Sequence, residues 1–357
     1  MAIFAPPHPH AALSLLFLLL AFTSQTSGQP VTGAPEECGS RSVGGGCHGG
    51  GETLKLKLIA ISSILVTSMI GVCLPIFSRA VPALQPDRDL FVVVKAFASG
   101  VILATGYMHV MPDSFNDLTS YCLPEHPWRR FPFTTFVAML SALATLMLDS
   151  FSTSCYQKGY LSGAPEPREQ VKDESAKELV KGEHCHINNS TDQIESQLLR
   201  YRVVAQVLEV GIVVHSVVIG LSMGTSDNPC TIRPLVAALC FHQLFEGMGL
   251  GGCILQAEYG YVMKMIMVFF FSVTTPFGIA LGIGLSNVYS PNSPTALIVV
   301  GLLNASSAGL LNYMALVDLL ASDFMGPKLQ GRAKLQIWAY VAVLLGAGCM
   351  SLMAKWA

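Results

Sequence analysis

The residues best suited to chemistry are two histidines and a glutamate that lie in apolar stretches of the sequence. His215 opens the stretch HSVVIGLSMG, and His242 opens the stretch HQLFEGMGLG, which contains Glu246. Aligned without gaps, the two stretches share histidine at the first place and glycine at the sixth and tenth places. Two imidazoles and one carboxylate form a ligand set that proteins use for divalent metal ions. The pattern therefore predicts a metal site built from two related copies of one short sequence.

The composition around these residues is that of a membrane protein. Hydrophobic residues make up 52% of the 357 residues and charged residues only 12%, and the mean hydropathy is +0.52. Soluble domains carry about 25% charged residues, so a soluble globular protein is not expected. The net charge of −2 shows no basic signature, and nucleic acid is therefore not an expected partner.

Eight segments are long and apolar enough to cross a bilayer, which takes about 20 residues. Clusters of Pro, Gly and charged residues separate them. We therefore predict an all-α membrane protein with eight transmembrane helices. The predicted spans are 54–78, 90–115, 132–154, 202–224, 233–256, 262–289, 294–321 and 334–355.

The N-terminal sequence predicts a secretory signal peptide over 1–28 and an extracellular segment over 29–53. The alternative is an uncleaved first helix. In the oxidising compartment that a signal peptide implies, Cys38 and Cys47 are expected to form a local disulfide, and metal binding by Cys47-His48 is the weaker alternative. The other cysteines lie mostly in apolar stretches and are expected to behave as small hydrophobic residues.

Positive charge predicts the orientation. Of the 21 Lys and Arg residues, 14 fall on the inner side of this arrangement and 7 on the outer side, which favours N-out and C-out. Helices 1–3 then occupy 54–154, a cytoplasmic variable loop occupies 155–201, and helices 4–8 occupy 202–357.

The loop is polar and poor in aromatic residues, and we expect it to be disordered. It contains His184-Cys185-His186, which could bind a metal transiently; the alternative, equally reasonable, is that this sequence has no role. It also contains glycosylation sequons at Asn188 and Asn189.

The depth of the candidate ligands agrees with a site inside the membrane. His215 lies ten residues before Thr225 and His242 nine residues after Arg233, so each lies roughly 14 Å below the outer boundary. The hydrocarbon core is about 30 Å thick, which places both histidines near its middle. Two copies running in opposite directions predict an inverted-repeat bundle around a midplane site. The alternative is that Glu246 is protonated and both histidines are polar links in a helix core.

The sequence resembles the ZIP (Zrt/Irt-like) family of metal transporters, and its plant branch in particular. The stretches that carry the resemblance are KAFASGVILATGYMHVMPDSF, HSVVIGLSMG, HQLFEGMGLGG and SAGLLNYMALVDLLASDF, together with the N-terminal Cys pair and the variable loop. The resemblance implies eight helices and import of zinc and similar divalent ions into the cytoplasm.

The resemblance also implies roles for single residues. His215, His242 and Glu246 occupy the central transport site of the family, which is expected to hold one metal ion here. Ser216 and Gln243 fall where some relatives have Asn and Asp, and they could supply oxygen ligands. His109 and Asp113 match the entrance residues of the family. For Asp149 and Asp318, near the inner helix ends, packing or capping explains the residues as well as an exit role does.

Taken together, the sequence predicts a plasma-membrane, multi-pass Zn²⁺ importer that is not an enzyme and requires no cofactor. Fe²⁺, Mn²⁺ and Cd²⁺ can use the same donors. The expected partners are divalent metal ions and the lipid bilayer, and a homodimer is compatible with the sequence. The alternatives are an intramembrane zinc-dependent hydrolase, although HQLFE lacks the HExxH pattern, and a metal exporter.

Overall fold

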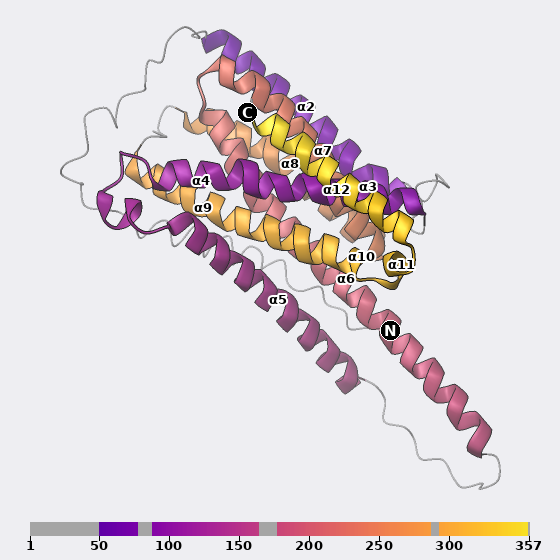
Figure 1. The fold of residues 1–357 in the computed structure, drawn as a ribbon. Coiled ribbons are helices and arrows are strands. Elements are labelled where there is room, and N and C mark those ends of the chain that lie inside the picture. The colour runs from indigo at the N-terminus through magenta and orange to yellow at the C-terminus, as the bar shows by residue number, and fades with distance from the viewer. Residues whose placement is uncertain (1–49, 78–87, 164–176, 287–292, 356–357) are drawn as a thin grey trace.

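The computed structural model describes residues 50–77, 88–163, 177–286 and 293–355, and this part of the chain is almost entirely helical (Figure 1). Within it, eight helices are long and apolar enough to cross a membrane, which confirms the predicted number of spans. They are α2 (Gly50–Phe77), α3 (Asp89–Thr105) continued by η4 (Gly106–Val110) and α4 (Met111–Leu118), α5 (Phe133–Gly163), α6 (Lys177–Thr225), α7 (Pro229–Gln256), α8 (Tyr261–Leu285), α9 (Pro294–Tyr313) continued by η6 (Met314–Ala321) and α10 (Ser322–Phe324), and α12 (Ala333–Ala354). Two short helices, η5 (Glu125–Arg129) and α11 (Pro327–Gln330), lie between them.

The helices pack as two bundles. In bundle 1, α2 packs mainly against α7 and α6 packs mainly against α8; in bundle 2, α3 packs mainly against α12 and α5 mainly against α9. The packing is preserved when α2 is exchanged with α8, α3 with α9, α5 with α12 and α6 with α7. Under this exchange the α2–α7 pair becomes the α8–α6 pair, and the α3–α12 pair becomes the α9–α5 pair. The two most extensive contacts between the bundles, α3 with α7 and α9 with α6, also exchange. This internal two-fold pattern matches the predicted inverted repeat.

Burial is uneven among the spans. The most apolar 18-residue window of α7 is 72% buried, whereas the corresponding windows of α5 and α12 are only 17% and 22% buried. The helix that carries His242 and Glu246 is therefore central, and α5 and α12 leave most of their apolar surface to lipid.

Close helix approach in bundle 1 depends on glycine, and it is repeated in the two halves. Gly278 of α8 lies against the backbone of α6, where an added Cβ would be 2.9 Å from the Val217 carbonyl oxygen. In the other half, an added Cβ at Gly71 of α2 would collide with the Leu244 carbonyl oxygen of α7. Val217 and Leu244 each follow a candidate histidine by two residues. The two glycine contacts therefore lie at equivalent positions along the two histidine helices.

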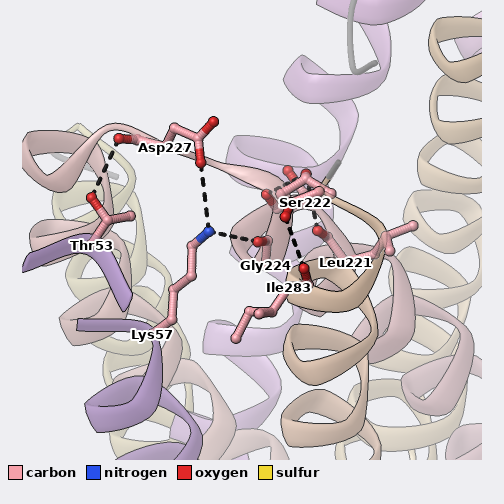
Figure 2. Close-up of polar contacts among 9 residues, drawn as sticks. Thr53, Lys57, Leu221, Ser222, Gly224, Asp227 and Ile283 are labelled. Atoms are coloured by element: carbon pink, nitrogen blue, oxygen red, sulfur yellow. Dashed lines mark hydrogen bonds and ion pairs between the residues drawn. The ribbon is translucent and has the colours of Figure 1, made fainter. Parts of the chain in front are cut away.

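A buried lysine joins α2 to the short connection between α6 and α7 (Figure 2). The Nζ atom of Lys57 donates to the Gly224 carbonyl oxygen at 2.7 Å and lies 3.9 Å from Asp227 Oδ1. The hydroxyl of Thr53 donates to the Asp227 carbonyl oxygen at 3.5 Å. A cation near the last carbonyls of a helix satisfies groups that have no partner within the helix. We call this side of the protein the α6–α7 end, and the opposite side, with the α7–α8 connection over 257–260, the α7–α8 end.

The polar segment between helices 3 and 4 corrects one expectation. It is predicted to be disordered over 156–199, yet its two described ends are helical: α5 continues to Gly163 and α6 begins at Lys177, while residues 164–176 lie outside the described residues. The two ends of this extension, 177–181 and 193–200, are rich in Glu, Lys, Gln and Leu, which have high helix propensity. The His184-Cys185-His186 sequence lies in this helical extension.

The predicted signal peptide, most of the segment 29–53, and Cys38 and Cys47 lie outside the described residues. Of the cysteines that the structure describes, Cys73, Cys240, Cys253 and Cys349 are free, as expected for small hydrophobic residues in a membrane bundle. Cys122 and Cys230 are disulfide-bonded, which the sequence reading did not anticipate.

We predict that Gly278→Val lowers the thermal midpoint of the purified protein, because the new side chain would press on the α6 backbone. Overpacking of this kind costs about 1–3 kcal/mol. Thermal unfolding in detergent would measure the effect. The matched control is Gly284→Val on the same helix, where nothing lies within 4 Å of an added Cβ. An equal loss in both variants would show that the close contact at Gly278 does not matter.

Candidate metal-transport site

The structure brings three imidazoles into one row. The ring centres of His215 and His242 are 5.8 Å apart, and those of His242 and His109 are 6.4 Å apart. The three rings come from α6, α7 and η4, and their exposed fractions are 1%, 1% and 7%. An ion about 2.1 Å from an imidazole nitrogen lies roughly 3 Å from the ring centre, so two rings that share an ion have centres at most roughly 6 Å apart. The His215–His242 pair meets this condition.

Glu246 lies one turn after His242 on α7 and is completely buried. Neither of its oxygens has a hydrogen-bond partner in the described part of the chain, and the ring nitrogens of His215 and His242 have none either. Buried polar atoms without partners are rare and costly. A divalent cation would satisfy all three groups together, because it accepts electron pairs from imidazole nitrogen and from carboxylate oxygen.

Ser216 and Gln243 stand next to the two histidines and are 1% exposed each. The Ser216 hydroxyl has no hydrogen-bond partner among the described residues. The Thr275 hydroxyl of α8 donates to Gln243 Oε1 at 3.5 Å, while the Gln243 amide nitrogen remains unpaired. The Ser216 oxygen thus has no other partner among the described residues, whereas Gln243 Oε1 already accepts a hydrogen bond.

The site is not closed around one point in this structure. Among the described residues, no group of three or more His, Cys, Asp or Glu side chains is arranged to hold a metal ion. The imidazoles are paired at suitable distances, but the full ligand set requires rearrangement before it could enclose an ion. Such loose preorganisation suits a site that must release its ion.

His109 and Asp113, which the sequence analysis treats as an entrance pair, occupy different environments. His109 is buried beside His242, whereas Asp113 is exposed. His109 lies in η4, a π-helical turn in which the amide of Met111 donates to the Gly106 carbonyl oxygen. Such a turn holds one residue more than an α-helical turn, and it is frequent at functional sites.

Sequence reasoning missed Asn312, whose side chain lies against η4. Asn312 Oδ1 occupies the space that a Cβ at Gly106 would need. Its side chain is 8% exposed, and Oδ1 has no hydrogen-bond partner among the described residues. A polar residue inside a membrane span is a functional signal in its own right, and the asparagine in the apolar run GLLNYMALV could have been found in this way.

Asp149 and Asp318 lie on the side of the site that faces the α7–α8 end. Asp318 lies in η6 and is 4% exposed. The Tyr313 hydroxyl donates to Asp149 Oδ2 at 3.4 Å, which joins α9 to α5. Asp149 therefore makes a packing contact between α5 and α9, and Asp318 contributes a buried carboxylate at the η6 turn.

The fold and the site define a polytopic membrane protein with buried histidine and glutamate side chains at the centre of its helix bundle. A family model described as ZIP zinc transporter matches residues 54–354, and the chain belongs to the ZIP family. It is 60% identical to "Fe(2+) transport protein 2" of Oryza sativa subsp. japonica over 346 residues, which cover 90% of this chain and 91% of that protein. It is 56% identical to "Fe(2+) transport protein 1" of Arabidopsis thaliana (97% and 98% covered) and 55% identical to "Zinc transporter 7" of the same plant (96% and 97% covered).

Family membership confirms the predicted class of function. The chain is a divalent-metal transporter of the membrane, and the proteins that it resembles are transport proteins rather than enzymes.

We predict that Glu246→Gln raises the thermal midpoint of the metal-free protein by about 2 °C, since about 1 kcal/mol has this effect in a chain of this size. The neutral amide costs less to bury than an unpaired carboxylate. The same variant should lose the increase in midpoint that added Zn²⁺ gives to the wild type. Thermal unfolding in EDTA and in Zn²⁺ measures both effects.

The control for this experiment is Glu125→Gln, which changes an exposed carboxylate paired with Arg130. It should leave the response to Zn²⁺ unchanged. A lower metal-free midpoint in Glu246→Gln would show that the protein itself satisfies the buried carboxylate.

Proposed function

We propose that this protein carries Zn²⁺ and chemically similar ions into the cytoplasm through a site formed by His215, His242 and Glu246. The observation that supports the proposal is the buried row of imidazoles beside a carboxylate that has no hydrogen-bond partner in the described part of the chain. Charged and polar groups at this depth in a bilayer are expensive, and an ion pathway explains their presence.

His109 extends the site toward the α6–α7 end. Its ring adjoins that of His242, and Asp113 is exposed one turn further along the chain. An ion attracted by the Asp113 carboxylate would exchange water for His109 and then for the central ligands. Ser216, and Gln243 after a rotation of its amide, could complete the coordination with oxygen.

The ligand chemistry suits several metals. Imidazole and carboxylate bind Zn²⁺, Fe²⁺, Mn²⁺ and Cd²⁺ with different affinities but with the same donor atoms. The similar proteins named for zinc and for Fe(2+) support the first two ions in particular. Two neutral imidazoles and one carboxylate leave a divalent ion under-neutralised, which favours release. An inside-negative potential adds a driving force of about 4.6 kcal/mol per 100 mV for a divalent ion.

The orientation is part of the proposal. We place the α6–α7 end outside, which makes both termini external and the long segment between α5 and α6 cytoplasmic. Disulfides form in oxidising compartments, and disulfide-bonded Cys122 and Cys230 both lie at the α6–α7 end. The excess of Lys and Arg on the other side supports the same orientation. We further propose the plasma membrane as the location, a homodimer as the assembly, and transient metal binding by His184-Cys185-His186.

We predict that His215→Ala, His242→Ala and Glu246→Ala each reduce uptake of ⁶⁵Zn²⁺ by cells to the background rate, because each removes one of few ligands. Surface biotinylation should show unchanged abundance. The matched control is His126→Ala, since His126 is exposed in η5 and is not one of the proposed ligands. Normal uptake by the Glu246 variant would refute the ligand assignment. Lower cellular zinc on expression of the wild type would indicate an exporter, and no movement of zinc would favour the hydrolase.

We predict that Asn188 and Asn189 carry no glycan, because the proposed orientation keeps their sequons in the cytoplasm. Digestion with a glycosidase, followed by gel electrophoresis, would check this. As a positive control, a sequon introduced at the α4–α5 connection should be glycosylated. A glycan on the native sequons would reverse the orientation and, with it, the direction of transport.

A further inference from the structure

A second buried lysine joins the two bundles at the α7–α8 end. Lys95 of α3 is 5% exposed, and its Nζ atom lies 3.0 Å from Asp323 Oδ1 and donates to Gln256 Oε1 at 3.3 Å. Asp323 belongs to α10, at the end of the α9 span, and Gln256 is the last residue of α7. Three helices that are far apart in the sequence therefore meet at one ammonium group.

The two acceptors of Lys95 belong to different bundles. Lys95 and Asp323 lie in bundle 2, whereas Gln256 lies in bundle 1 on the helix that carries His242 and Glu246. The Lys57–Gly224, Thr275–Gln243 and Tyr313–Asp149 hydrogen bonds each stay within one bundle, whereas the His109–His242 ring contact also crosses from one bundle to the other. The Lys95–Gln256 bond thus stands out as a polar contact that depends on the relative position of the bundles.

The chemistry of the two contacts is unequal. The bond to Asp323 joins opposite charges, and charge-assisted hydrogen bonds are about twice as strong as neutral ones. The bond to Gln256 is longer and has a neutral acceptor. If the bundles separate at this end, Lys95 can remain with Asp323, so its buried charge is never left unpaired. The contact across the bundles can therefore break at low cost while the ion pair persists.

We propose that Lys95 and Gln256 are positioning residues of the transport cycle, which hold α7 against bundle 2 when the cytoplasmic side of the site is closed. This inference rests on the proposed function and orientation, because alternating access requires one bundle to move against the other around the site. In this scheme the latch formed by Lys95 and Gln256 favours the state that is open to the outside, and it opens when the ion is released inward.

The test changes the strength of the latch without touching the Lys95–Asp323 pair. Gln256→Glu places a second carboxylate beside Lys95, which strengthens the contact and should lower the Vmax of ⁶⁵Zn²⁺ uptake at least threefold without raising the KM. Gln256→Ala removes the contact and should raise the KM at least threefold, because a smaller fraction of molecules presents the site to the outside. Both rates are corrected for surface abundance by biotinylation. Gln256 is partly exposed, so both variants should fold.

The matched control is Arg332→Gln. Arg332 and Asp89 form an exposed ion pair at the same end, but both residues lie outside bundle 1. This variant should keep the KM and Vmax of the wild type. The inference fails if both Gln256 variants have the KM and Vmax of the wild type. It also fails if Gln256→Glu and Gln256→Ala shift these two constants in the same way as each other. Uptake that is absent from the wild type would instead refute the proposed function.

Discussion

The structure depends on keeping metal-ligating atoms buried at a depth where lipid offers no hydrogen bond. Glu246 and the imidazoles of His215 and His242 are almost completely buried, and the described part of the chain supplies their polar atoms with no partner. Such atoms can persist only in a bundle that is stabilised elsewhere. The glycine contacts of α2 with α7 and of α8 with α6 provide this support, because they let backbones meet at van der Waals distance on the far side of the histidine helices.

The internal two-fold pattern explains why the site lies between the bundles. His215, His242 and Glu246 belong to bundle 1, while His109 comes from bundle 2 and reaches the same row of rings. An ion held by residues of both bundles is sensitive to their relative position. The two buried lysines reflect the same division, since Lys57 ties together helices of bundle 1 and Lys95 reaches from bundle 2 to α7.

Much of the fold could be predicted from the sequence because a bilayer imposes strong and simple constraints. The spans were located to within a few residues, since apolar length alone defines them, and the two histidines were paired because their stretches repeat. The helical extension before Leu198 was missed because it is polar, and its helix follows from local propensity that hydropathy does not record. The π-helical turn that carries His109 could not be predicted, because such a turn has no clear signature in one sequence. The contact of Asn312 with Gly106 joins residues about two hundred positions apart, and no local pattern predicts such a contact.

The wide turn at Gly106–Val110 has a consequence for how a protein of this kind can change over evolutionary time. One additional residue rotates a side chain by about 100° relative to a regular helix, and the turn confines that rotation to a single site. The turn therefore places the His109 ring beside His242 while α3 packs against α12 and α4 packs against α9. The chemistry met by an incoming ion can thus diverge between descendants of one gene without any revision of the surface that faces lipid.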